Sequence, residues 1–194
     1  MEYFELLNAD GTKMGKVKER NLVHQDGDWH GGSHIWVVRK KDEPKEAESK
    51  YEVLLQKRKK DKDSFPGCYD VSCAGHMDKG ETFLSTALRE LLEELNLSVT
   101  QDQITFLFSQ RVEGEYVFHG RPFVNREVNY VYLLNLEVAL DNVKYQEEEI
   151  EELVWMDLDR LCFHIENRNP KFCIWQEEMK GLYDYLTKMD VKLE

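Results

Sequence analysis

The segment from residue 75 to residue 97, GHMDKGETFLSTALRELLEELNL, constrains this chain more than any other part of it. Its leucines recur at intervals of three and four residues, at Leu84, Leu88, Leu91 and Leu95. This is the spacing of an amphipathic helix with one buried face. The pattern predicts a helix over residues 82–95, with Thr82 as its N-cap.

Three carboxylates lie close together near the end of this predicted helix. Glu90 is spaced i,i+3 from Glu93 and i,i+4 from Glu94, and like charges at these spacings cost roughly 0.2–0.5 kcal/mol per pair. The helix dipole also disfavours anions at a C-terminus. Two unfavourable terms at one place indicate a bound cation, whereas a solvated acidic face is the alternative. Oxygen ligands without nearby cysteines suit Mg2+ or Mn2+, ions that often bind together with substrate phosphates.

The residues around these carboxylates complete a longer pattern, G-x5-E-x7-R-E-L-x-E-E-x-N-L, which adds Gly75, Glu81, Arg89 and Asn96. The pattern resembles the Nudix box. Asparagine replaces the usual glycine at position 96, and asparagine also tolerates the left-handed backbone of a helix end. Arg89 is spaced to reach both Glu93 and Glu81, so we expect it to position carboxylates.

The resemblance implies a fold and an activity. The fold is an α/β/α sandwich with a mixed central sheet. The activity is Mg2+- or Mn2+-dependent hydrolysis of a diphosphate linked to another group, X, such as a nucleoside, in a small-molecule substrate. The implied metal ligands are Glu94, Glu90, Glu93 and the carbonyl of Ala74.

The whole chain supports one domain, residues 1–194, because neither a linker nor a repeat divides its 194 residues. We expect a strand and hairpin extension over residues 1–33 and a C-terminal helix over residues 170–190. A net charge of −12 argues against a nucleic-acid surface. Without an apolar leader or a run of 18 apolar residues, we expect a cytosolic protein that does not enter membranes. The four cysteines, which form no C-x-x-C pair, are expected to be reduced and mostly buried.

Alternating and apolar runs predict the remaining elements. Residues 3–20 indicate two strands around a turn, and further strands are expected at 34–39, 51–56, 69–74, 104–113 and 127–136. A loop over 40–50 is expected between the strands at 34–39 and 51–56. A short strand, LVWM, and a helical segment near 158–162 follow. The tail, residues 171–188, carries an apolar stripe at helical spacing, which begins at Phe172 and Trp175. This stripe is expected to pack in the core or against a second copy of the chain in a homodimer.

Several segments outside the box are similar to a particular Nudix branch, the type I isopentenyl-diphosphate isomerases. They are RNLVHQDGDWHGGSHIWV, LLQKRKKDKDSFPGCYDVSCAGH, REVNYVYLL and EEEIEELVWMDL. In those isomerases a cysteine before the Gly-His carries the chemistry, a later glutamate opposes it, and three histidines with acidic residues bind a metal. The resemblance therefore implies a second metal site at His24, His30 and His76, although isolated histidines of this kind are more often simple surface or hydrogen-bonded residues.

The catalytic cysteine of the isomerases is missing here, because Ala74 takes its place. The isomerases also have a degraded box, whereas this chain keeps Arg89 and all three glutamates. A hydrolase is therefore expected. An isopentenyl-diphosphate isomerase is the first alternative, and a non-catalytic diphosphate-binding module is the second.

Hydrolysis requires a base and cations for the phosphates. Glu93 inside the box and Glu127 outside it are the candidates for the base, since a charge on an otherwise apolar strand such as that of Glu127 needs a partner or a function. Lys57, Arg58 and Lys62 match the positions at which the isomerases hold diphosphate, with a solvated basic loop as the alternative. Group X remains open, since aromatic residues such as Trp29, Tyr69, Tyr116 and Phe123 would suit a base or an isoprenoid.

Overall fold

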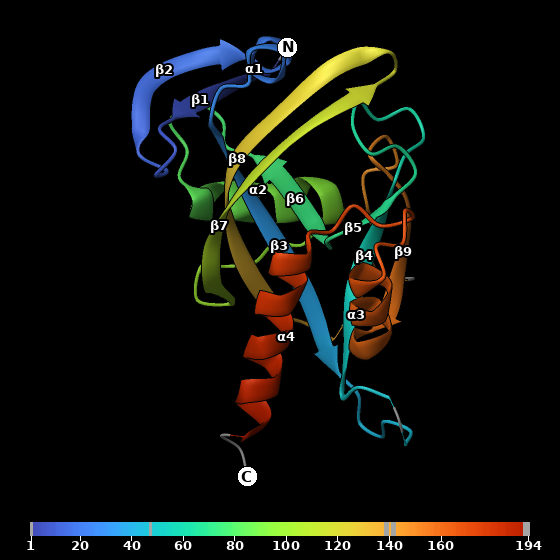
Figure 1. Ribbon diagram of the computed structural model, residues 1–194. Helices are drawn as coiled ribbons and strands as arrows, with labels where there is room; N and C mark the ends of the chain where they lie inside the picture. Colours follow the sequence, from blue (N-terminus) through green and yellow to red (C-terminus); the bar gives the residue numbers. More distant parts are fainter. Residues whose placement is uncertain (1, 47, 138–139, 141–142, 192–194) are drawn as a thin grey trace.

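The computed structural model describes residues 2–46, 48–137, 140 and 143–191 (Figure 1). In chain order its elements are β1 (Tyr3–Leu7), β2 (Lys13–Glu19), α1 (Arg20–Asp26), β3 (His30–Lys40), β4 (Tyr51–Arg58), β5 (Tyr69–Asp70), β6 (Cys73–His76), α2 (Phe83–Leu95), β7 (Ile104–Phe118), β8 (Arg121–Asn135), β9 (Ile150–Asp157), α3 (Leu158–Glu166) and α4 (Gln176–Val191).

Strand β3 is the centre of the sheet. It runs parallel to β8 from the pair His30–Glu127 onward, and antiparallel to both β4 and β6. The outer pairs β7–β8 and β4–β9 are antiparallel. The sheet is therefore mixed, as the sequence predicts.

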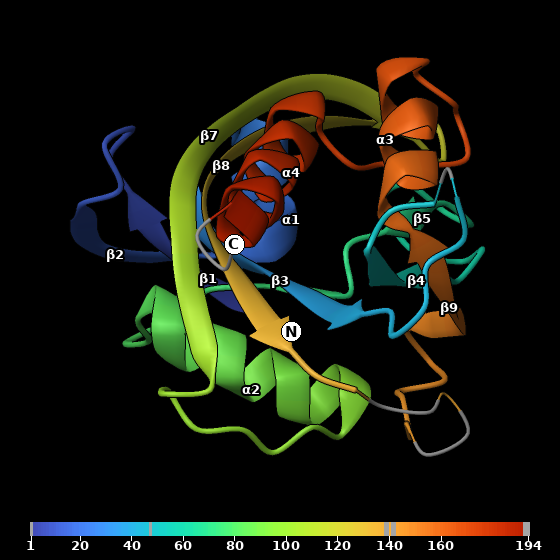
Figure 2. The same cartoon turned by 90° about the horizontal axis from the view of Figure 1, so that it is seen from below.

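Alternating side chains of β3 enter two different cores. Trp36 and Val38 pack with residues of α3 and α4, whereas Ile35 and Val37 pack with the apolar face of α2. Since successive residues of a strand face opposite sides, the continuous apolar run of β3 has to be covered on both faces. Figure 2 shows α2 on one side of the sheet and α4 on the other. The predicted α/β/α sandwich is confirmed.

The partner of β3 along one edge changes from β4 to β6, and this change opens the sheet. Strand β4 pairs with β3 only from Val38 to Lys40, and β6 takes over from Gly32 to Ile35. Ser72 bridges the divergence, because its hydroxyl accepts from the Val37 amide at 2.7 Å and donates to the Leu54 carbonyl at 2.6 Å. The predicted single strand over 69–74 is consequently two short strands, β5 and β6.

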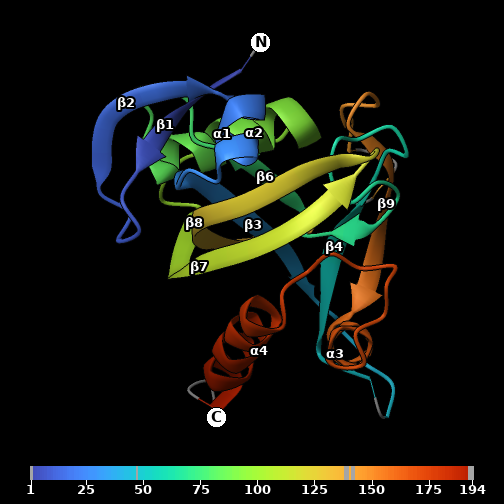
Figure 3. The ribbon, with the colours of Figure 1, turned by 45° about the horizontal axis from the view of Figure 1, so that its top comes forward.

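The β7–β8 hairpin is longer than predicted and bends across the molecule toward the loop that follows β4 (Figures 1 and 3). At its tip, Nε2 of His119 lies 2.9 Å from the carbonyl oxygen of Lys62. Phe65 of that loop packs edge-on against Tyr116 and Phe118 of the hairpin. Two segments that are distant in sequence therefore meet above the sheet.

Other predictions need correction. Residues 20–26 form a helix, α1, where only a strand and hairpin extension was expected. The C-terminal helix begins at Gln176, because the segment before it bonds to β5: the Tyr69 amide donates to the Lys171 carbonyl and the Cys173 amide to the Tyr69 carbonyl. All four cysteines are free, but only Cys73 is fully buried. Within the described residues, no helix has the length and apolarity needed to cross a membrane.

Candidate active site

Helix α2 has the ends that the sequence predicts. Thr82 caps its N-terminus in a reciprocal capping box with Ser85, and Asn96 ends it in the left-handed conformation with φ of 52°. The apolar face of α2 packs on the sheet. This packing buries Glu90 and Glu94 as well, whereas the Glu93 side chain stays 54% exposed.

Arg89 holds this acidic cluster together. Its guanidinium donates to both carboxylate oxygens of Glu81, at 2.8 and 3.1 Å, and to the carbonyl of His76 at 2.9 Å. It also donates to Glu90 at 2.7 Å and to Glu93 at 3.0 Å. Five hydrogen bonds from one planar group fix the carboxylates relative to β6. Arg89 therefore serves mainly to position these carboxylates and not to bind a ligand.

Glu90 occupies the space where position 75 would carry a side chain. A Cβ atom at Gly75 would lie 1.8 Å from Oε1 of Glu90 and 2.0 Å from its Cδ. The glycine of the box thus lets a carboxylate of the helix pass the backbone of β6. Burial, together with the charge of Glu94, raises the pKa of Glu90 to about 8.

Glu94 reaches the same place from the next turn of α2. It accepts hydrogen bonds from the Ala74 amide at 3.3 Å and from Gln56 at 3.2 Å. Burial raises the pKa of Glu94, so two buried carboxylates share a site with too little positive charge. A hard divalent cation would supply the missing positive charge, and the carboxylates of Glu90 and Glu94 would be its ligands.

The carboxylates open into a cavity of about 350 Å³. Its lining brings together most of the residues that the sequence singles out: Arg58, Lys62, Ala74, His76, Arg89, Glu90, Glu93, Glu94 and Glu127. Phe123 is the only one of the four proposed stacking residues in the lining. The cavity lies where β4 and β6 diverge, so the opening of the sheet creates it.

The three basic candidates separate in the structure. Arg58 lines the cavity and is held by Asp70 at 3.2 Å and by the Ser64 carbonyl. Lys62 lines it too, in contact with Glu149, and burial lowers the pKa of its ammonium, as do the nearby charges of Arg58 and Arg20. Lys57 lies outside the lining, where its ammonium contacts Glu151 and Glu152 at 3.1 and 3.2 Å. Neighbours on a strand face opposite sides, which explains the separation of Lys57 from Arg58.

Arg20 is a cavity residue that the sequence analysis missed. It is the first residue of α1, lines the cavity and is bonded to Glu2 at 2.7 Å. Together with Arg58 and Lys62, it makes a group of three cations in a protein of net charge −12. Each of the three is paired with a carboxylate of the same lining, Glu2, Asp70 or Glu149, so a phosphate would have to compete with these partners for the cations. The only sequence signal of Arg20 was its place four residues before His24.

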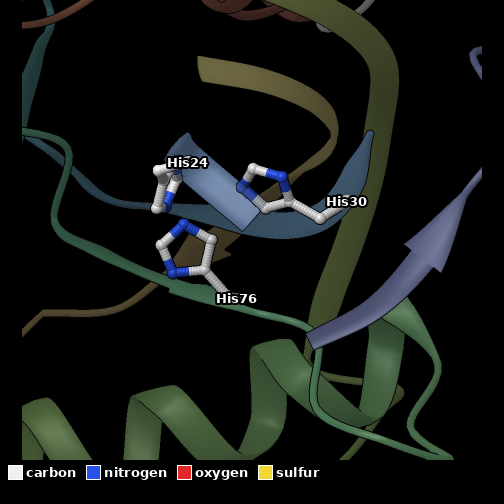
Figure 4. A group of neighbouring side chains, drawn as sticks. All are labelled: His24, His30 and His76. Atoms are coloured by element: carbon white, nitrogen blue, oxygen red, sulfur yellow. The ribbon is translucent and has the colours of Figure 1, made fainter. Parts of the chain in front are cut away.

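The histidines that the resemblance singles out come together. His24 on α1, His30 on β3 and His76 on β6 each offer a ring nitrogen, and these nitrogens lie within 4.8 Å of one another. Figure 4 shows the three rings facing one another. Within the described part of the chain, both nitrogens of His24 and Nε2 of His30 are buried without a hydrogen-bond partner, an arrangement that a bound metal ion would satisfy.

The environment of the three rings favours metal binding. Nδ1 of His30 lies 3.0 Å from the Asp28 carbonyl, a contact that places its proton there and leaves the Nε2 lone pair free. Burial lowers the pKa of His24 to about 3 and that of His76 to about 4. The two rings are therefore neutral at pH 7, as metal ligands must be.

Glu127 belongs to this cluster. Its Oε1 lies 3.0 Å from Nε2 of His76 and 3.4 Å from Nε2 of His30, and its Oε2 accepts from Asn129 at 3.0 Å. Burial alone would raise the pKa of Glu127, but the two rings hold it well below its ordinary value. Only 12% of its side chain is exposed, so Glu127 is not a solvent-exposed residue at the edge of the sheet.

The family model for the NUDIX domain matches residues 33–176, the part of the chain that contains the box, the cavity and most of the sheet. The chain belongs to the Nudix family. It is 34% identical over 175 residues to Nudix hydrolase 3 of Arabidopsis thaliana, an alignment that covers 88% of this chain but 21% of that protein. The chain thus spans about a fifth of the length of that relative.

The chain is also similar to an isomerase in sequence and to a solved structure in fold. It is 28% identical over 177 residues to an isopentenyl-diphosphate Delta-isomerase of Serratia proteamaculans, with 90% of this chain and 87% of that protein covered. The crystal structure of DR0079 from Deinococcus radiodurans superposes with a TM-score of 0.60 at 17% identity, over 86% of this chain and 90% of that one. That structural likeness concerns the fold alone.

Proposed function

We propose that this Nudix protein hydrolyses a diphosphate linkage in a small molecule and that it uses Mg2+ or Mn2+. The observation that carries the proposal is the pair of buried carboxylates, Glu90 and Glu94, which open into the same cavity as the cations Arg20, Arg58 and Lys62. Carboxylates for a metal and cations for phosphate oxygens are the two requirements of this chemistry.

Each group has a role that follows from its position. A bound divalent metal would supply charge neutralisation and a water of lowered pKa. Glu90, Glu94 and the Ala74 carbonyl would hold it, and Arg89 keeps the carboxylates in place. Arg58, Lys62 and Arg20 would bind phosphate oxygens in the cavity. Lys57 has no such role, because acidic neighbours hold it elsewhere.

Glu93 is the better candidate for the general base. It lines the cavity, is largely exposed, and has Arg89 as its contact within the described part of the chain. Glu127 is less suited, because His76 and Asn129 already engage its two oxygens. A base must accept a proton from water, and a carboxylate held by several donors has a reduced tendency to do so.

We further propose a second metal site formed by His24, His30, His76 and Glu127. Imidazole ligands suit Zn2+ or Fe2+ better than Mg2+, and the carboxylate of Glu127 also suits Mn2+. Titration with Mn2+ under electron paramagnetic resonance should give two sites per chain in the wild type and one in the His24→Gln variant. A stoichiometry of one in both proteins would contradict the second site.

A panel of hydrolysis assays tests the main proposal. Nucleoside di- and triphosphates, dinucleotides, ADP-ribose and isoprenoid diphosphates are incubated with Mg2+ or Mn2+, and the released phosphates are identified. We expect metal-dependent cleavage of at least one class, lost in Glu94→Gln with a melting temperature that stays level or rises without metal, since one like charge is removed. Near wild-type turnover in Glu94→Gln would place the active site elsewhere.

The isomerase is the second candidate, and the histidine cluster with Glu127 favours it, together with the similarity to the Serratia isomerase. Position 74 opposes it. The Ala74 side chain lines the cavity, whereas the thiol of Cys73 is fully buried among residues that pack against α2, where it is hydrogen-bonded to Glu94. No thiol therefore reaches the cavity at the position that this chemistry uses. A purely binding role is less well supported, because the box carboxylates are complete.

A further inference from the structure

Two cysteines share one face where β5 meets the segment before α4. The Tyr69 amide donates to the Lys171 carbonyl at 2.7 Å and the Cys173 amide donates to the Tyr69 carbonyl at 3.0 Å, so the two segments pair in parallel. The rings of Tyr69 and Phe172 pack together on one face of this pair, with their centroids 5.5 Å apart. Because side chains alternate along an extended chain, Cys68 and Cys173 both lie on the other face.

The two thiols are in contact and accessible. They are hydrogen-bonded to each other. Each also lies near a carbonyl oxygen of the opposite segment: Sγ of Cys68 is 3.7 Å from that of Pro170, and Sγ of Cys173 is 3.4 Å from that of Tyr69. Both cysteines are only partly buried, and Cys173 lines the cavity. A small dissolved oxidant can therefore reach the pair.

The two thiols differ in acidity. A hydrogen bond from Cys173 lowers the pKa of Cys68 to about 7, although burial opposes the shift. Burial, together with the same hydrogen bond, raises the pKa of Cys173 well above its ordinary value. A large fraction of Cys68 is therefore ionised at pH 7, and the thiolate is the reactive form of cysteine. A neighbouring cysteine that stays protonated is the usual partner for resolving an oxidised thiol.

We propose that Cys68 and Cys173 are a redox modification site, at which hydrogen peroxide converts the two thiols into a reversible intramolecular disulfide. The Cys68 thiolate attacks one peroxide oxygen, the O–O bond breaks, and the leaving hydroxide takes up a proton to form water. Sγ of Cys173 then attacks the sulfur of the sulfenic acid, the S–O bond breaks, and the thiol proton leaves with the hydroxide as a second water. The two thiols lose two electrons, which the peroxide gains.

The disulfide would attach β5 to the wall of the cavity. Ile174 and Trp175, which follow Cys173, line the cavity, and so does Asp70, two residues after Cys68. The cross-link would also close a loop of about 100 residues and so restrict the unfolded chain. We therefore expect the oxidised protein to melt at a higher temperature than the reduced protein. This inference does not depend on the proposed hydrolysis, in which neither sulfur has a role.

Oxidation of the whole chain by hydrogen peroxide tests the site. The remaining thiols are blocked with iodoacetamide under denaturing conditions, and the peptide map should then contain Cys68 joined to Cys173. The melting temperature should rise and should return to the reduced value with dithiothreitol. Cys162→Ser is the matched control, because Cys162 on α3 is another partly buried thiol, and burial raises its pKa to about 12. This variant should form the cross-link as the wild type does.

Two substitutions at position 173 separate hydrogen bonding from disulfide formation. Cys173→Ser keeps a donor but has no second sulfur, so Cys68 should be alkylated at pH 7 within about threefold of the wild-type rate, and its sulfenic acid should accumulate and be trapped by dimedone. Cys173→Ala also removes the donor, and alkylation of Cys68 should slow by about 10-fold. In the folded wild type, Cys68 should be alkylated at least ~10-fold faster than Cys162.

The wild type alone can overturn the inference, whatever the stability of the variants. Oxidation without a link between Cys68 and Cys173 would do so, as would a disulfide between two chains or one that contains Cys162. Equal dimedone labelling of the wild type and Cys173→Ser would show that Cys173 does not resolve an oxidised Cys68. Equal alkylation of Cys68 in the wild type and Cys173→Ala would show that the two thiols are not in contact.

Discussion

Substitution of Gly75 by alanine tests the core of the proposed site with a single methyl group. The new Cβ would lie 1.8 Å from Oε1 of Glu90, whereas ordinary van der Waals contact begins near 3.4 Å. The Glu90 carboxylate therefore has to move by about 1.6 Å. Its other contacts give little freedom, because Arg89 fixes it on one side and the carboxylate of Glu94 repels it on another.

A displacement of this size should be severe for catalysis and mild for the fold. Misplacing a catalytic group by about 1 Å can cost ~100-fold in rate, so we expect Gly75→Ala to lose at least about 100-fold in kcat/KM. Mn2+ affinity at the box should fall with it. Because Glu90 is buried at the cost of a raised pKa, its movement toward the cavity removes an unfavourable term, and the melting temperature should change little.

The assay pairs initial rates with Mn2+ titration, and Gly80→Ala is the control. Gly80 lies inside the box, just before Glu81, has open space around its Cβ position and has φ of 86°. Alanine there is strained by an amount on the order of 1 kcal/mol, so this variant should lose stability and keep activity. Wild-type rate and metal affinity in Gly75→Ala would show that Glu90 is not a ligand and that the glycine serves only the backbone.

Three more predictions concern the other parts of the site. Glu127→Gln should weaken binding of Mn2+ or Zn2+ at the histidine cluster and leave Mg2+ affinity of the box within a few fold; an equal loss at both sites, by calorimetry, would make Glu127 a box ligand. The buried carboxylate of Glu178 on α4 accepts a hydrogen bond from Nδ1 of His34 on β3 at 2.9 Å and, despite burial, raises the pKa of His34 from 6.5 to about 9. The ion pair therefore stabilises the fold fully below pH 6.5, and its contribution disappears as the pH rises toward 9. The difference in melting temperature between wild type and His34→Gln should shrink over that range, and a constant difference would refute the ion pair. Finally, NMR in D2O should show neither deuterium uptake nor dimethylallyl diphosphate from isopentenyl diphosphate, because Ala74 has no titratable group; enzyme-dependent exchange would establish the isomerase.

The sequence by itself determined the parts of the site that lie within one helix. The apolar spacing of α2 and the clustering of Glu90, Glu93 and Glu94 follow from the periodicity of 3.6 residues per turn, and the Thr82 cap and Asn96 end follow from the backbone preferences of these residues. Strand runs were similarly visible, because β3 contains the apolar run 35–38 and β8 a run of β-forming residues over 128–134. The first and last residues of the strands were less predictable. Pairing between β7 and β8 made both strands longer than expected, and pairing with different neighbours divided the predicted strand over 69–74 into β5 and β6.

Only the tertiary structure decided which distant residues share the cavity and which form the histidine cluster beside it. His24, His30, His76 and Glu127 come from α1, β3, β6 and β8, and no local pattern contains their spacing. The basic run after β4 could not show that Arg58 faces the cavity and Lys57 does not, because that depends on which face of the strand is covered. His34 and Glu178 are 144 positions apart in the chain. Their contact exists only because β3 needs a helix over each face, and α4, the last element, supplies one of them.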